Sequence, residues 1–229
     1  MTEIQSDNET FEDKYVRKRF GIFRGLLSPY LIQGTRMLEI GCYTANLLRF
    51  LPPFVEYFGI DIDENALEIA RQRGAKTMKL DLDNEEIPLK QKFDVIIATE
   101  ILEHLRDPEK LILEIKCLAE KGGVILISLP NECTIYHRLK VLFGKGIDGT
   151  GFAPCYHLHF PTLKQDSEFM EKHFEIVKKS YWVHLGVGKM EKCLSWIPDR
   201  IWTILADLYP SLFARGVIYL CKIREEVSL

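Results

Sequence analysis

The sequence predicts an α/β fold in which helices cover both faces of a mostly parallel β-sheet. Short apolar segments alternate with longer amphipathic segments between residues 36 and 130, and the joints between them are short. This alternation is typical of strand–helix–strand units. The chain has 229 residues, of which 47% are hydrophobic and 28% are charged, an ordinary balance for one domain with its own core.

Five of the apolar segments are predicted to be strands of this sheet. They are Met37–Ile40, Val55–Ile60, Lys76–Leu80, Phe93–Ala98 and Val124–Leu129. The segments between them have helical periodicity and end at proline or glycine. These predicted helices are Thr44–Leu51, Glu64–Arg73 and Pro108–Glu120.

The remaining residues are expected to complete a single domain, 1–229. A helix at Leu163–His173 and strands at Phe174–Val183 and Val217–Ile223 would extend the sheet to seven strands. Three other segments are expected to surround it. They are a helical cap at residues 1–30 with a helix at Phe11–Leu27, an insertion at 131–160 that roofs the ligand pocket and contains the helical piece Thr134–Phe143, and a helical insertion at 188–213. The insertion at 188–213 could cover the sheet, form a homodimer face or dock on a membrane surface.

Composition and charge argue against several classes of protein. The net charge of −3 does not indicate the excess of positive charge that nonspecific nucleic-acid binding needs. The six cysteines include no CxxC pair and no zinc-ligand spacing, so we expect reduced thiols in a cytoplasmic protein. The first ten residues do not read as a secretory signal, and no apolar run approaches the roughly 20 residues of a membrane span.

The turn after the first predicted strand indicates the ligand. Glu39-Ile40-Gly41-Cys42-Tyr43 runs from the strand into the turn, and Asp61 follows the second strand, where it can bind the ribose hydroxyls of an adenosine cofactor. A dinucleotide turn would need glycines where the chain has Tyr43 and Asn46, which disfavours an NAD-dependent oxidoreductase. S-adenosylmethionine fits, because it has a ribose but no pyrophosphate, and Glu39 can attract its ammonium group.

Five ordered motifs carry a family resemblance. They are MLEIGCYTA, YFGIDID, KLDLD, FDVIIATEILEHLRDP and GGVILISLPN, between Arg36 and Asn131, and a later HLHFPT is similar to a segment of many members. With them the chain resembles the class I S-adenosylmethionine-dependent methyltransferases, closest in motif style to quinone-biosynthesis O-methyltransferases. The resemblance implies a Rossmann-like three-layer sandwich whose seven-stranded sheet is mostly parallel with an antiparallel last strand. It also implies S-adenosylmethionine as the cofactor.

The family's cofactor residues can be carried over position by position. The resemblance implies that Asp61 binds the ribose, Ile62 lies against the adenine, and Asp81 with Leu82 binds the adenine amino group, while Thr99 faces the methionine end. The full set of implied cofactor residues is Glu39, Gly41, Cys42, Tyr43, Asp61, Ile62, Asp81, Leu82 and Thr99. The family's glycine-rich turn keeps only its first glycine here, and the bulky Tyr43 disfavours the positive φ that such a turn uses.

The stretch Glu100-Ile101-Leu102-Glu103-His104 is the candidate catalytic site. In a first helical turn, Glu100, Glu103 and His104 would share one face. His104, with Glu100, could act as a general base on an acceptor hydroxyl. Alternatively, the three could bind a divalent cation that orients substrate oxygens and lowers the pKa of a hydroxyl. A third interpretation gives His104 only a capping or packing role. His157 and His159 could complete the site from across the pocket.

These residues lead us to expect methyl transfer to a hydroxyl, since a histidine base or a metal helps a hydroxyl most. The expected acceptor is a small molecule, a lipid-linked compound or a glycan, because aromatic and basic residues are mixed in the 131–160 segment. Two alternatives share the fold. Small-RNA terminal 2′-O-methyltransferases carry a similar E-x-x-E-H, and a noncatalytic scaffold domain would fill its own pocket, for instance with Tyr43.

Overall fold

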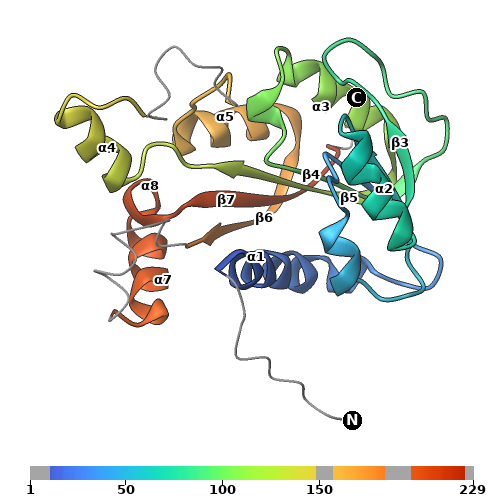
Figure 1. Ribbon diagram of the computed structural model, residues 1–229, viewed down its shortest axis with the longest axis horizontal. Helices are drawn as coiled ribbons and strands as arrows, with labels where there is room; N and C mark the ends of the chain where they lie inside the picture. The colour runs from blue at the N-terminus through green and yellow to red at the C-terminus, as the bar shows by residue number, and fades with distance from the viewer. Residues whose placement is uncertain (1–10, 148–156, 184–196, 225–229) are drawn as a thin grey trace, which may run out of the picture.

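The described strands form one sheet in the order β3-β2-β1-β4-β5-β7-β6 (Figure 1). A computed structural model describes residues 11–147, 157–183 and 197–224 of the chain. Strands β1 to β5 pair in parallel, whereas β7 runs antiparallel to both β5 and β6. The prediction of a mostly parallel seven-stranded sheet with an antiparallel last strand is confirmed.

The strands lie close to their predicted positions, with one difference at β5. Their bounds are β1 Arg36–Ile40, β2 Glu56–Asp61, β3 Lys76–Lys79, β4 Phe93–Thr99, β5 Ala119–Pro130, β6 Glu175–Trp182 and β7 Gly216–Lys222. β5 begins earlier than predicted because Ala119 already pairs with Phe93, before an irregularity in the register. A side chain at Gly123 would come within 2.9 Å of a backbone oxygen, so only glycine allows this close approach.

The helices follow the predicted order, but one of them is shorter and of another type. Their bounds are α1 Phe11–Leu27, α2 Glu64–Gln72, α3 Pro108–Leu118, α4 Ile135–Leu142, α5 Leu163–His173, α7 Asp199–Leu208 and α8 Pro210–Phe213, with 3₁₀ helices η1 Ser28–Tyr30, η2 Asn46–Phe50 and η3 Leu102–His104. The prediction of an α-helix at Thr44–Leu51 was wrong, because the segment forms only η2. Ala45 has φ 51°, a left-handed conformation, so it cannot be part of a right-handed α-helix that begins at Thr44.

Two hydrophobic clusters lie on opposite faces of the sheet and account for its three layers. Successive residues of β4 alternate between them: Ile96 contributes to one cluster and Val95 to the other. Helices α3 and α5 cover the first face, and α1 and α2 cover the second. Phe23 and Leu27 of α1 are fully buried, so this helix is a packed part of the domain.

The C-terminal helices α7 and α8 form a small separate cluster. Ala206 and Ala214 pack with Val183, whereas Ile201, Ile204 and other apolar side chains of α7 remain exposed. Residues 188–196 of the predicted insertion and residues 148–156 of the predicted roof lie outside the described residues. No helix among the residues that the structure describes is long and apolar enough to cross a membrane.

Candidate active site

The parallel register brings the candidate cofactor residues to one edge of the sheet. Ile40 at the end of β1 pairs with Ile60 on one side and with Ala98 on the other. The residues that follow these strands therefore meet at the carboxyl edge, where open α/β sheets bind their ligands. Asp61 and Thr99 end two of these strands at this edge.

The turn after β1 is held by backbone hydrogen bonds to β2. The amides of Gly41 and Cys42 both donate to the carbonyl of Ile60, at 2.8 and 3.0 Å. The amide of Tyr43 donates to Oδ2 of Asp61 at 2.7 Å. Tyr43 adopts φ 48° despite its bulk, and its side chain is 59% exposed. The ring is thus not buried in the fold, as the scaffold alternative would need.

Glu39 is a buried acid beneath this turn. Its side chain is 3% exposed, and it accepts a short hydrogen bond from the hydroxyl of Tyr57. Burial raises the pKa of Glu39 to about 7, although the Tyr57 hydrogen bond and the nearby Arg19 oppose the rise. Glu39 is therefore sensitive to any cation that enters this edge of the sheet.

The acids after β2 and β3 are tied into their own loops. Asp61 also accepts a hydrogen bond from the amide of Asp63 at 2.9 Å. Asp81 accepts from the amide of Asp83 and from the side chain of Asn84, and the Asn84 hydrogen bond lowers its pKa. Ile62 is 59% exposed although it is apolar, which is the exposure expected of a residue that contacts a ligand. Leu82 is partly buried beside Asp81.

Arg19 of α1 reaches the same edge, which the sequence analysis did not anticipate. Its Nη2 lies 3.4 Å from Oγ of Ser128, and the Ser128 hydroxyl donates to Oε1 of Glu100 at 3.0 Å. The Arg19 charge also opposes the raised pKa of both Glu39 and Glu103. Its spacing of four residues from the buried Phe23 is the signal that could have placed it on the inner face of α1.

The E-x-x-E-H stretch does not form the first turn of an α-helix, which was the condition for its three polar side chains to share one face. Glu100 has φ 52°, a strained conformation for a residue other than glycine, and only Leu102–His104 forms a 3₁₀ helix. The three side chains therefore do not share a helical face. The Glu100 carboxylate accepts the hydrogen bond of Ser128, while Glu103 and His104 form part of another group.

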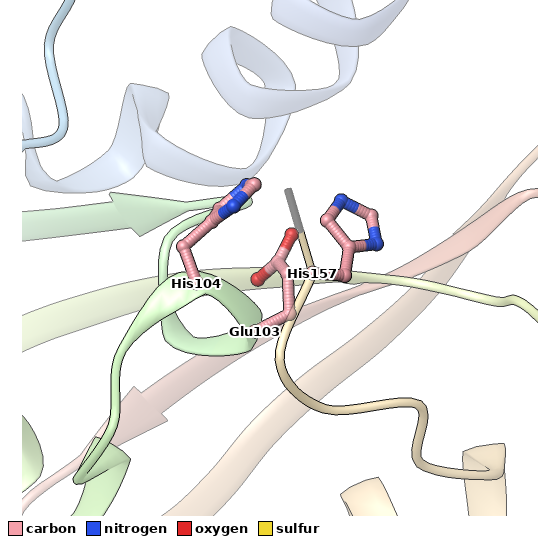
Figure 2. Close-up of side chains that lie close together, drawn as sticks. All are labelled: Glu103, His104 and His157. Carbon is pink, nitrogen blue, oxygen red and sulfur yellow. The ribbon is translucent and has the colours of Figure 1, made fainter. Parts of the chain in front are cut away.

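Glu103, His104 and His157 converge in a cluster that could hold a metal ion (Figure 2). One ligand atom from each lies within 4.8 Å of the others, and the two imidazole rings stack edge to face with centroids 4.7 Å apart. Two of the three predicted metal candidates, Glu103 and His104, thus lie in this cluster together with His157, whereas Glu100 lies outside it. His159 does not join, because its Nε2 donates to the carbonyl of Leu105 at 2.8 Å.

The Glu103 carboxylate is the most unusual group of this cluster. It is 2% exposed, and neither oxygen has a hydrogen-bond partner among the described residues. Burial and then the nearby Glu100 raise its pKa to about 8. A buried carboxylate without a partner is costly unless it holds a proton or a cation. The donor set of one carboxylate and two imidazoles is one that divalent transition metals accept.

Backbone hydrogen bonds join the two halves of the cluster. The amides of Leu158 and His159 both donate to the carbonyl of Glu103, at 2.7 and 3.2 Å. His157 is therefore attached to η3 by the main chain. Outside the cluster, Glu132 lies 3.2 Å from both His157 and His137, and the His157 hydrogen bond lowers the pKa of this carboxyl.

The family of the chain follows from comparison with known proteins. A family model described as a methyltransferase domain matches residues 13–178, which include the sheet edge and the cluster above. The chain belongs to this methyltransferase family. The prediction of a class I S-adenosylmethionine-dependent methyltransferase is confirmed.

Individual relatives resemble the chain over only part of their length. It is 36% identical over 98 residues to an uncharacterized protein of Methanocaldococcus jannaschii, covering 42% of this chain. It is 32% identical over 108 residues to the ubiquinone biosynthesis O-methyltransferase of Bordetella bronchiseptica, covering 44% of this chain. The matches span 45% of the length of each relative.

Solved structures confirm the fold over nearly the whole chain. The N-methyltransferase NodS from Bradyrhizobium japonicum, solved with S-adenosyl-L-homocysteine, is similar with a TM-score of 0.60 at 15% identity. The similarity covers 96% of this methyltransferase and 90% of NodS. The chain therefore shares its Rossmann-like three-layer fold with this solved structure.

Proposed function

We propose that this chain transfers the methyl group of S-adenosylmethionine to a hydroxyl of its acceptor at the Glu103–His104–His157 cluster. The observation that carries the proposal is the buried Glu103 carboxylate, which has no hydrogen-bond partner among the described residues and lies beside two imidazoles. The relatives named ubiquinone biosynthesis O-methyltransferase support oxygen as the methylated atom.

The carboxyl edge of the sheet offers the groups that the cofactor needs. When bound, S-adenosylmethionine supplies an electrophilic methyl group on a sulfonium. Asp61 would accept hydrogen bonds from the ribose hydroxyls, while the exposed Ile62 would contact the adenine and Asp81 its amino group. Glu39 would attract the cationic amino-acid end, and Arg19 would bind its carboxylate. The remaining members of this proposed cofactor site are Gly41, Cys42, Tyr43, Leu82 and Thr99.

A divalent cation at the cluster is the first candidate for activating the acceptor. It would be held by Glu103, His104 and His157, and it would lower the pKa of an acceptor hydroxyl bound next to it. This use explains why a carboxylate with a pKa near 8 is kept among two imidazoles. Glu100 would remain outside, because its carboxylate is bound to Ser128.

Catalysis by His104 as a general base, without a metal, is the second candidate. The side chains of His104 and His157 lie against each other, so either could accept the hydroxyl proton. In both candidates most of the acceleration comes from holding the hydroxyl in line with the methyl group.

The surface of α4 supports an acceptor with an apolar part. The exposed apolar side chains include Tyr136, Leu139 and Leu142 of α4 and Phe143 directly after it. Arg138 and Lys140 lie on the same helix. A lipid-linked acceptor with a polar or anionic head would match this mixture of apolar and basic groups, and so would contact with a membrane surface.

The proposal is tested by following labelled methyl groups. The purified protein is incubated with methyl-labelled S-adenosylmethionine and fractionated cell extract, and the labelled product is identified. We expect label on an oxygen, and a loss of at least about 100-fold in rate for Glu103→Gln and His157→Gln. Glu168→Gln, which changes an exposed glutamate of α5, is the matched control.

Chelation separates the two candidate mechanisms. Loss of transfer with EDTA and recovery with added Co²⁺ or Mn²⁺ would favour the cation, whereas full activity in EDTA together with inactive His104→Gln would favour the base. Undiminished transfer in both Glu103→Gln and His104→Gln would refute the role of the cluster. Label found on RNA would favour the 2′-O-methyltransferase alternative.

A further inference from the structure

Glu132 connects two histidines through its two carboxylate oxygens. Oε1 lies 3.2 Å from Nδ1 of His157, and Oε2 lies 3.2 Å from Nε2 of His137. Beyond them, Oγ1 of Thr134 lies 2.9 Å from Nδ1 of His137. These side chains are largely buried. A continuous chain of polar contacts thus runs from the start of α4 to the histidine of the candidate centre.

The chemistry of these groups determines where the hydrogens lie. An ionised carboxylate can only accept hydrogen bonds, so both histidine nitrogens that face Glu132 carry a hydrogen. His137 then has its lone pair on Nδ1, where the hydroxyl of Thr134 can donate. Both nitrogens of His137 and both oxygens of Glu132 are used in this arrangement. A His157 ring whose single hydrogen is on Nδ1 correspondingly has its lone pair on Nε2.

We propose that Glu132 is a positioning residue that holds His157 as the Nδ1–H tautomer, so that Nε2 is available to the Glu103–His104–His157 centre. This inference rests on the function proposed for that centre. Histidines that bind metals generally donate their other N–H to a carboxylate or carbonyl, which fixes the ring and makes the free nitrogen more basic. The same tautomer is required if His157 accepts a proton from the acceptor hydroxyl.

The contact with His137 makes Glu132 more than a single hydrogen-bond acceptor. Because its second oxygen is held by a buried ring of α4, the carboxylate cannot rotate away from His157 without leaving the His137 N–H unpaired. The helix that carries the exposed apolar side chains is thereby connected to the candidate centre. Glu132 therefore couples the position of α4 to the orientation of His157.

The position of the hydrogen on His157 can be read directly by NMR. Long-range ¹H–¹⁵N spectra are recorded on the whole chain with ¹⁵N-labelled histidine, in EDTA at pH 8. The His157 signals are assigned from their loss in His157→Gln. We expect the wild type and Glu168→Gln to have the Nδ1–H tautomer, and Glu132→Gln to shift toward Nε2–H. A wild-type His157 with its hydrogen on Nε2 would overturn the inference even if Glu132→Gln failed to fold.

Titration with Co²⁺ gives a second readout that separates this inference from the proposed function. We expect Glu132→Gln to bind Co²⁺ about 10- to 100-fold more weakly than the wild type. Equal affinity, or an unchanged His157 spectrum in Glu132→Gln, would contradict the role of Glu132. A wild type with the Nδ1–H tautomer that transfers no methyl group would instead refute the proposed function and leave the role of Glu132 intact.

Discussion

Replacing Asp166 by asparagine should change how the stability of the protein depends on pH. Asp166 lies in α5 and is 2% exposed, and its Oδ2 has no hydrogen-bond partner among the described residues. Burial raises its pKa from 3.8 to about 7, an effect that Lys179 opposes and Glu100 increases. The folded state therefore keeps a proton that the unfolded chain has already lost between these two values.

The magnitude follows from this difference in pKa. Below pH 3.8 both states are protonated and the aspartate costs nothing. As the pH rises toward 7, the unfolded state is favoured by about 1.4 kcal/mol for each unit, so the wild type loses up to about 4 kcal/mol. Above pH 7 the loss is complete. Asparagine has no such dependence, although the burial of its amide adds a constant cost of about 1–3 kcal/mol.

Equilibrium unfolding in urea at pH 5, 6, 7 and 8 tests this reasoning. The stability of Asp166→Asn relative to the wild type should rise through pH 5 and 6 and become constant above pH 7. The comparison at each pH removes the contribution of Glu39, whose pKa is also raised. The Asp166 charge adds to the raised pKa of Glu103, so the measured difference includes this coupling. Asp207→Asn on the exposed side of α7 serves as the control. A difference that stays flat across this range would show that Asp166 is not held protonated in the fold.

Three further substitutions test the edge of the sheet. Gly59→Ala should destabilise the protein by about 1–3 kcal/mol, because the added Cβ would lie 2.5 Å from Sγ of Cys42. The double variant Gly59→Ala with Cys42→Gly should recover the melting temperature if this contact is the cause. Tyr43→Gly should raise stability or leave it unchanged, because the left-handed φ of Tyr43 costs about 1–2 kcal/mol, and a clear loss in urea unfolding would show that the exposed ring contributes more than expected. Arg19→Gln should weaken the binding of S-adenosylhomocysteine by about 10-fold or more in calorimetry, since a charged hydrogen bond is worth about 1.5–3 kcal/mol. Unchanged affinity would remove Arg19 from the cofactor site.

The sheet and the cofactor edge could be predicted because they depend on local patterns. Apolar runs identify β1, β2 and β4, and the parallel register then brings their ends together without further information. Asp61 and Glu100 are therefore placed at one edge as soon as the strands are known. The prediction of an α-helix at Thr44–Leu51 failed for a local reason. The left-handed conformation of Ala45 leaves no periodic signal in the sequence.

The residues of the cluster could be predicted only in part, because its assembly depends on contacts between distant segments. E-x-x-E-H pointed to Glu103 and His104, and the strained backbone at Glu100 is what separates the first glutamate from them. His157 was one of two histidines left open, and only the hydrogen bond of His159 to a carbonyl decides between them. Glu132 carries no motif, so its two histidine contacts could not be seen before the fold.

The attachment of the His157 segment to the Glu103 carbonyl has a consequence for how such a protein can diversify. The backbone amide of any amino acid except proline can make these hydrogen bonds. The attachment therefore does not depend on which side chains the two donor residues carry. Outside Glu132, Thr134 and His137, the stretch between β5 and His157 can therefore change its side chains without loss of this attachment. The binding surface can change there while His157 stays attached to η3.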